Sequence, residues 1–202
     1  DTMINICKSG NIELMKFIIN TFGIDAKYFT NNIFHSACLY GNVDIVKLII
    51  EMNPSIDISY HNEWGFKNAC LSGNFELMKY LISIKPDINV SIDNNRAFVF
   101  ICEYSTLDCL KFLIKIIPNI DIQTNNNEAF INACKTGNRE IINYLLELNP
   151  YIAYKFKERY LLCYEIVNTN ATIIQSWWKK KLYNPHSERG KKFILNQIEW
   201  AY

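Results

Sequence analysis

The chain has 202 residues and a formal net charge of +1, and 50% of its residues are hydrophobic. This composition excludes an intrinsically disordered chain, and the length suffices for one domain, or two small ones, with a buried core. A charge balance so near neutrality also argues against a non-specific nucleic-acid binder, which is usually strongly basic along its whole length.

The sequence predicts neither a membrane span nor a secretory leader. Lys, Asp or Asn interrupts every apolar run before the roughly 18 residues that a membrane-spanning helix requires. The seven cysteines are odd in number and mostly evenly spaced, which does not fit a disulfide framework. We therefore expect a reduced, intracellular protein.

An internal repeat organises most of the chain. Five cysteines at intervals of 31 or 32 residues each open a similar phrase, such as CKSGNIELMKFII and CLSGNFELMKYLI: Cys7, Cys38, Cys70, Cys102 and Cys134. Prolines and phenylalanines keep the same period: Pro54, Pro86, Pro118 and Pro150, and Phe34, Phe66, Phe98 and Phe130. Such a period predicts stacked copies of one supersecondary unit.

Each unit is predicted to be two helices joined by a turn. In the third unit, apolar residues on one face predict a first helix over 63–71. Gly73 supplies the left-handed residue that ends this helix, and Asn74 is the N-cap of a second helix over 75–84. Pro86 then prevents the helix from continuing.

The linkers between units follow the second helices. Residues 87–90 are expected to be extended, and Asp93-Asn94-Asn95 has the composition of a turn.

These units resemble ankyrin repeats. The run Asn32-Ile33-Phe34-His35-Ser36-Ala37, followed by Gly41, matches the start of the ankyrin phrase, although the usual Thr-Pro is missing. The resemblance covers roughly residues 1–155, in units near 1–30, 31–61, 62–93, 94–125 and 126–155. It implies an all-α solenoid of helix-turn-helix units with hairpin-like turns, and a His35 that supports its turn by hydrogen bonding. The Asn- and Ile-rich style is similar to that of ankyrin proteins of giant DNA viruses and some protists.

Two units depart from the pattern. The first begins directly with its helix, at Met3, so we expect the chain to be part of a longer array. In the fourth, Ser105-Thr106 replaces Gly-Asn and Ile101 replaces Ala, so this unit is expected to be the least regular.

Residues 156–202 are predicted to form a degenerate sixth repeat followed by a C-terminal capping helix. The charge differs between the two regions, since residues 1–154 carry a net −4 and residues 155–202 a net +5. The positive charge gathers in a basic patch of Lys179, Lys180, Lys181, Arg189, Lys191 and Lys192. The run 174–180 is also similar to the start of an IQ motif, a calmodulin-type helical ligand.

The sequence predicts no catalytic site, no cofactor-binding site and no metal-binding site. Stacked helices lie about 8–10 Å apart, so equivalent cysteines in successive units are too distant for a disulfide or a shared zinc ion, and we expect small buried thiols. The three histidines lie in no nucleophile or metal motif.

The remaining candidate function is non-enzymatic binding of a protein partner, without a small-molecule substrate, by a monomer. The resemblance implies binding through the concave face and the turn tips, where a host protein is the expected partner if the chain is viral. The candidate residues are Tyr40, Trp64, Asn68, Arg96, Glu103, Tyr104 and Lys135, with Trp64 the strongest. Two alternatives stay open: an adaptor whose IQ-like C-terminal helices recruit a second protein, calmodulin-like or a ubiquitin-ligase component, and association of the basic C-terminus with nucleic acid or a membrane surface.

Overall fold

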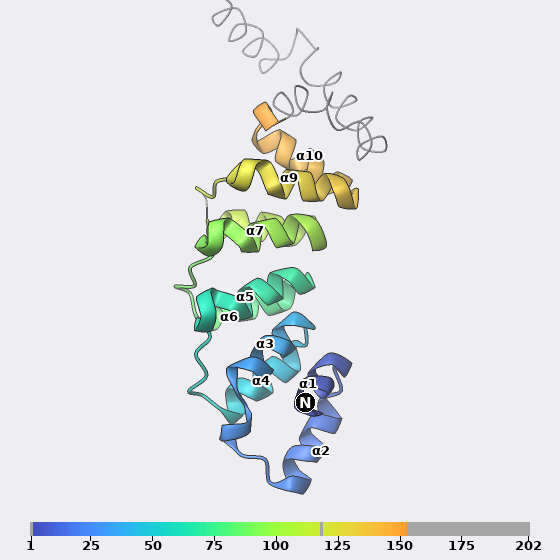
Figure 1. Ribbon diagram of the computed structural model, residues 1–202, viewed down its shortest axis with the longest axis vertical. Helices are drawn as coiled ribbons and strands as arrows, with labels where there is room; N and C mark the ends of the chain where they lie inside the picture. Colours follow the sequence, from blue (N-terminus) through green and yellow to red (C-terminus); the bar gives the residue numbers. More distant parts are fainter. Residues whose placement is uncertain (1, 118, 153–202) are drawn as a thin grey trace, which may run out of the picture. The chain divides into compact units, whose positions relative to one another are not determined.

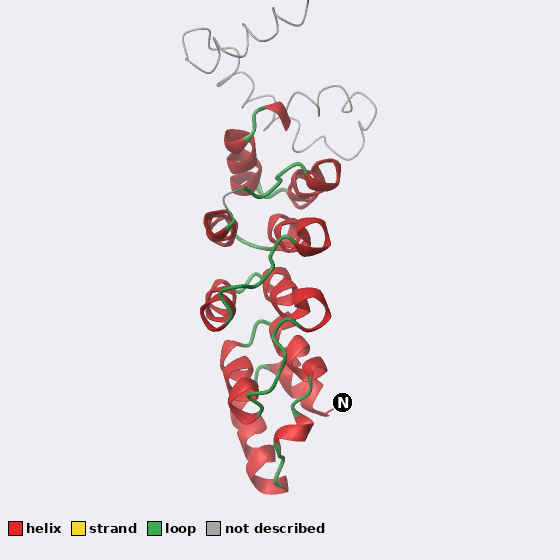
Figure 2. Cartoon of the chain, turned by 90° about the vertical axis from the view of Figure 1, so that its left-hand side faces the viewer, coloured by secondary structure: helices red, strands yellow, loops and turns green. Residues whose placement is uncertain are grey.

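The computed structural model describes residues 2–117 and 119–152, where all regular structure is helical (Figures 1 and 2). The chain divides into two compact units, residues 1–129 and 130–202. The boundary between these two units falls within α9 (Thr124–Thr136). The predicted boundary near residue 155, between the repeat array and the C-terminal segment, stays a prediction. The predicted sixth repeat, IQ-like run and basic patch lie outside the described residues.

The helices come in pairs that follow the sequence repeat. The pairs are α1 (Thr2–Ser9) with α2 (Ile12–Phe22), α3 (Asn31–Leu39) with α4 (Val43–Met52), α5 (Tyr60–Ser72) with α6 (Phe75–Ile84), α7 (Ile92–Tyr104) with α8 (Leu107–Ile116), and α9 with α10 (Arg139–Leu148). A short 3-10 helix, η1 (Ala26–Tyr28), precedes α3. The predicted second helix over 75–84 is confirmed residue for residue by α6.

Within residues 2–129, each helix pair stacks on the next. The first helices α1, α3, α5 and α7 contact one another in succession, as do the second helices α2, α4, α6 and α8. Figure 1 shows α3, α5 and α7 as successive layers. This arrangement is the predicted all-helical stack of paired helices.

The repeated apolar positions form the core. Phe34, Phe66, Phe98 and Phe130 are all fully buried, and each such ring contributes about 1.5–3 kcal/mol by leaving water. The five periodic cysteines are buried too, as predicted. Burial raises the pKa of the Cys7 thiol to about 11 and that of Cys134 to about 12, so both remain protonated near neutral pH.

The turn inside each unit depends on a left-handed residue, with one exception. Gly41 (φ 70°) and Gly73 (φ 68°) end α3 and α5 as expected. In the fourth unit Ser105 is extended instead (φ −117°, ψ −166°), and the Thr106 hydroxyl caps α8 by accepting from the Cys109 N–H at 3.4 Å. The helices α7 and α8 have the same lengths as α5 and α6, so the predicted irregularity is confined to the turn.

The turn tips, where each first helix begins, differ from the expected hairpin. Three successive residues at each of three tips have left-handed backbone: 61–63, 93–95 and 125–127. The right-handed part of α5 therefore starts at Trp64, one residue later than predicted. Residues 87–90 form no strand and carry short-range turn hydrogen bonds, such as Ile88 N–H to the Lys85 carbonyl at 3.3 Å, so the expectation of an extended linker is wrong.

Candidate functional site

The tip at residues 60–64 contains a residue type that its backbone disfavours, Glu63. The other two left-handed tips consist of Asp and Asn alone, which tolerate φ above zero. Here Glu63 (φ 57°) has the same conformation, at a cost of about 1–2 kcal/mol, whereas His61 (φ 58°) belongs to the residue types found there more often. Because strain of this kind concentrates at functional sites, we take this tip as the candidate site.

Aromatic rings run outward across this tip. The ring centroids of His35 and Tyr60 lie 5.9 Å apart, those of Tyr60 and His61 lie 5.9 Å apart, and those of His61 and Trp64 lie 6.0 Å apart. His35 is buried, whereas Tyr60 is 47% and Trp64 43% exposed. The tip therefore presents two large aromatic side chains to solvent, and the buried His35 ring lies beneath them.

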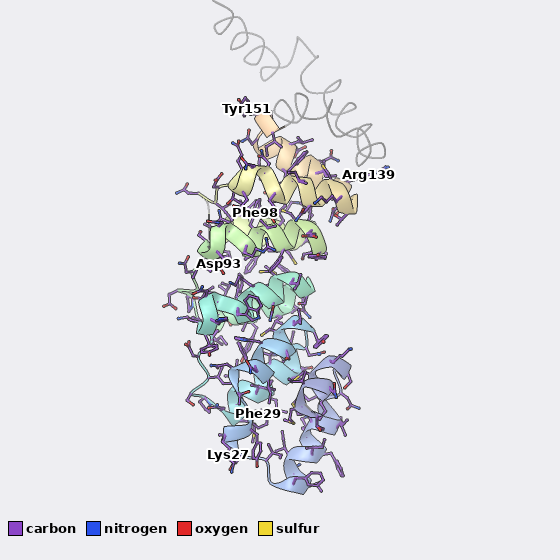
Figure 3. All side chains as sticks on the ribbon, viewed as in Figure 1. Lys27, Phe29, Asp93, Phe98, Arg139 and Tyr151 are labelled. Carbon is purple, nitrogen blue, oxygen red and sulfur yellow. The ribbon has the colours of Figure 1, made fainter. Side chains whose placement is uncertain are left out.

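Charged groups surround the rings. The Lys67 ammonium is bound by the Asp93 carboxylate and lies 5.1 Å from the centroid of the Trp64 ring. The Lys67 side chain is only 3% exposed, and a buried ammonium needs such a counter-charge, whereas the Asp93 side chain is 43% exposed. Figure 3 shows Asp93 on the loop side, where α7 begins.

Glu63 completes the group. Glu63 is 6% exposed, and its Oε1 accepts a hydrogen bond from the Asn89 N–H at 3.3 Å. Its Oε2 is buried without a donor among the described residues. We refer to the following six residues as the tip cluster: Tyr60, His61, Glu63, Trp64, Lys67 and Asp93.

His35, which lies beneath the cluster, is expected to support its turn by hydrogen bonding. Its Nε2 is buried without a hydrogen-bond partner in the described part of the chain, so the expected support of the turn through this atom is not present. Burial, and to a lesser degree the charge of His61, lowers the pKa of His35 to about 4. His35 is therefore a neutral ring that supports Tyr60 by stacking.

Asn68 must be removed from the predicted binding residues. It is 5% exposed, and its Nδ2 donates to the His35 carbonyl at 3.0 Å. Asn68 thus links α5 to α3 inside the stack and is not available to a partner.

The other predicted residues lie away from the tip cluster. Tyr40 and Tyr104 are 42% and 56% exposed, but they stand at the C-terminal ends of α3 and α7, away from the tips. The hydrogen bond that the Tyr104 hydroxyl donates to the Glu103 carboxylate raises the pKa of Tyr104. Lys135 is exposed on α9, in the unit that begins at residue 130. Only Trp64 of the predicted set belongs to the tip cluster.

Arg96 stands at the position of Trp64 in the next unit and has partners of its own. Its guanidinium pairs with Glu128 at 2.9 Å and lies 4.7 Å from the centroid of the Phe100 ring. Because both partners come from residues 1–129, this aromatic–arginine–carboxylate arrangement is internal to one compact unit.

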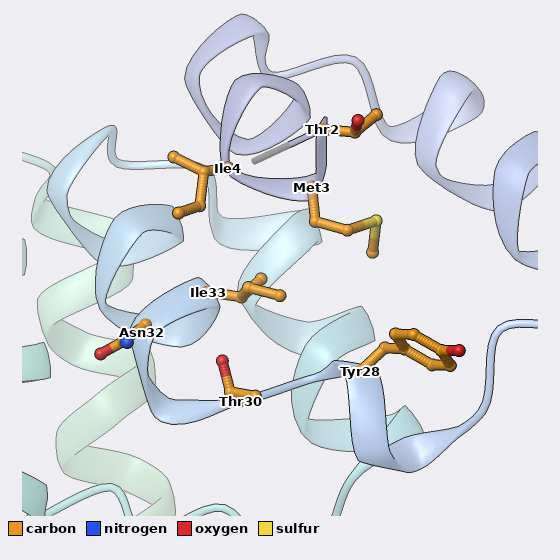
Figure 4. Close-up of a pocket in the computed structure, with 7 residues that line it drawn as sticks. All are labelled: Thr2, Met3, Ile4, Tyr28, Thr30, Asn32 and Ile33. Carbon is orange, nitrogen blue, oxygen red and sulfur yellow. The ribbon is translucent and has the colours of Figure 1, made fainter.

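A pocket of about 350 Å³ opens between α1, η1 and the start of α3 (Figure 4). It is lined by Thr2, Met3, Ile4, Tyr28, Thr30, Asn32 and Ile33. None of these side chains is a carboxylate, an amine or an imidazole, so the lining offers hydroxyl and amide contacts and no acid–base pair.

Sequence reasoning missed most of the tip cluster. Five of its residues were not among the candidates, because their importance depends on contacts between units: Tyr60, His61, Glu63, Lys67 and Asp93. One signal was visible: His and Glu stand where the next two units have Asp or Asn.

Two further searches cover the described residues alone. Among them no group of three or more His, Cys, Asp and Glu side chains could hold a metal ion. Within the same residues, no helix is both long and apolar enough to cross a membrane.

Comparison with protein families identifies the repeats. Residues 66–155 match the family described as ankyrin repeats (3 copies), and residues 29–58 match the family described as ankyrin repeat. Neither the curated proteins nor the solved structures contain a significant match. The two family matches together cover more than half of the chain and follow the paired helices described above, so the chain is an ankyrin-repeat protein.

Proposed function

We propose that this protein binds a protein partner without catalysis, and that the tip cluster is the centre of the contact. Ankyrin repeats generally mediate protein–protein interactions. The observation that carries the proposal is the pair of exposed aromatic rings, Tyr60 and Trp64, held on a tip whose backbone is strained. Tyr40, Arg96, Glu103, Tyr104 and Lys135 are proposed as further, weaker contacts.

The energetics of interfaces support this choice of centre. Trp and Tyr are enriched among the few residues that carry most of the binding energy, because they bury a large area with few rotatable bonds. Loss of one such side chain costs 2 kcal/mol or more in typical interfaces, which is about a 30-fold loss of affinity.

The test is affinity capture with two matched variants. Trp64→Ala removes the proposed centre, and Tyr28→Ala removes an exposed tyrosine, 49% exposed, at the position of Tyr60 one unit earlier. We expect a partner retained by the parent and by Tyr28→Ala and lost by Trp64→Ala, with circular dichroism confirming that both variants fold. Equal retention by all three proteins would refute the tip as the centre.

A second candidate rests on the net +5 charge of residues 155–202. We propose it as a secondary contact with nucleic acid, an anionic membrane or a second protein, as in an adaptor. Nucleic-acid binding would weaken steeply with added salt, and neutralising Lys179, Lys180 and Lys181 would reduce that dependence on salt.

The likeness to ankyrin proteins of giant viruses rests on the Asn- and Ile-rich composition. If the chain is viral, the proposed partner is a protein of the host.

A further inference from the structure

We propose that the tip cluster recognises an arginine side chain in a basic segment of the partner. This inference rests on the proposed function, since it names the chemistry of the partner for the same surface. It follows from the charges, the rings and an internal example in the next unit.

The tip cluster carries an uncompensated negative charge. It contains two carboxylates, Glu63 and Asp93, and one ammonium, that of Lys67, which pairs with Asp93. One oxygen of each carboxylate is used, by the Asn89 N–H and by Lys67. The residues 1–154 as a whole carry a net −4, so the surroundings add to the attraction of a cation.

The rings supply the second half of a cation site. A cation within about 6 Å of an indole face is attracted by the ring quadrupole. The Trp64 ring already holds one cation in this way, the Lys67 ammonium at 5.1 Å, and 43% of the Trp64 surface remains open to solvent. Asp93 is equally accessible, so a partner group can reach a ring and a carboxylate together.

The next tip shows which cation suits this combination. There Arg96 lies 4.7 Å from the Phe100 ring centroid and pairs with Glu128 at 2.9 Å. A planar guanidinium can stack on a ring while its edge donates to a carboxylate, whereas a lysine ammonium is a compact point charge. At the 60–64 tip the corresponding position is Trp64, so the chain offers the ring and the carboxylate and the partner would bring the arginine.

The experiment uses the full chain and short peptides of defined composition. An eight-residue Gly/Ser peptide with two arginines is titrated against the ¹⁵N-labelled protein, and the Trp64 indole N–H and the amides of 60–64 and 93–95 are followed by NMR. Matched peptides replace both arginines with lysine, with citrulline (a neutral arginine isostere) or with glutamate.

Four protein variants complete the design. Trp64→Leu removes the ring, Trp64→Phe keeps one, and Asp93→Asn removes the exposed charge. Glu76→Gln is the control, because Glu76 is an exposed carboxylate on α6, away from the tip, that pairs with Lys79 at 2.7 Å. Should Asp93→Asn unfold, the two Trp64 variants still decide the outcome.

We expect the arginine peptide to shift the tip resonances most, the lysine peptide less, and the citrulline and glutamate peptides hardly at all. Trp64→Leu should weaken arginine binding about 5-fold, Trp64→Phe should restore most of it, and Glu76→Gln should leave it unchanged. Equal shifts from the citrulline peptide, or arginine binding indifferent to Trp64→Leu, would overturn the inference.

The two proposals fail in different ways. If capture of a partner depends on Trp64 but the arginine peptide does not bind the tip, the proposed function stands and the arginine assignment is wrong. If the arginine peptide binds the tip but no partner depends on Trp64, the cation site stands and the proposed function is wrong.

Discussion

His35 makes stability depend on pH at the scale of a single residue. Its pKa is about 4 in the folded chain and near 6.5 when exposed. The unfolded chain therefore binds the proton more readily between these two values, and the free energy of unfolding falls as the pH drops from about 6.5 to about 4. The loss amounts to at most about 3 kcal/mol.

Urea unfolding of the parent and of His35→Leu at several pH values measures this effect. The stability of the parent should fall relative to that of the variant through this window and run parallel to it above pH 7. Parallel profiles at all pH values would show that His35 is not the group responsible.

Asn74 acts at the scale of the helix and of the link between helices. Its Oδ1 accepts from the Leu77 N–H at 2.9 Å and caps α6, while its Nδ2 donates to the Gly41 carbonyl at 2.7 Å in the preceding unit. Asn11 caps α2 in the same way, accepting from Leu14 N–H at 2.9 Å, and is exposed. Asn74 thus caps a helix and also links two repeat units, whereas among the described residues the Asn11 side chain only caps a helix.

We expect Asn74→Ala to lower the free energy of unfolding by about 2 kcal/mol and Asn11→Ala by about 1 kcal/mol. The difference reflects the carbonyl of Gly41, which loses its donor only in the first variant. Chemical unfolding of both variants measures it, and equal losses would mean that the link between units contributes nothing.

At the scale of the whole molecule, the stack within residues 2–129 is held by contacts between neighbouring pairs of helices. In such an array stability is approximately a sum of unit and interface terms, so damage should stay local. Phe98, fully buried in α7, is the place to test this.

Phe98→Ala should cost about 3–5 kcal/mol in its own unit. Hydrogen exchange should accelerate strongly in α7 and α8, less in α5 and α6, and least in α1 and α2. A uniform acceleration throughout residues 2–129 would show instead that this part of the chain unfolds as one cooperative block.

The sequence determined the repeat, its helices and much of its core by itself, because each is encoded by neighbours within one unit. Periodic apolar residues define a helix face, Gly73 fits a left-handed turn and Asn74 fits an N-cap, whatever lies beyond the unit. The family and a general role in protein binding followed from the same local phrases.

The tertiary structure decided which side chains meet between units, since such contacts join residues 26–33 positions apart. Asn68 has a surface-like position in the sequence, yet it is buried because His35 of the preceding unit offers it a carbonyl. Gly65 stands where the next units have Ala97 and Ala129, and only the packing shows that a Cβ there would lie 2.5 Å from the Phe34 ring. The tip cluster has the same origin: Trp64, Lys67 and Asp93 acquire their joint chemistry only when α7 stacks on α5.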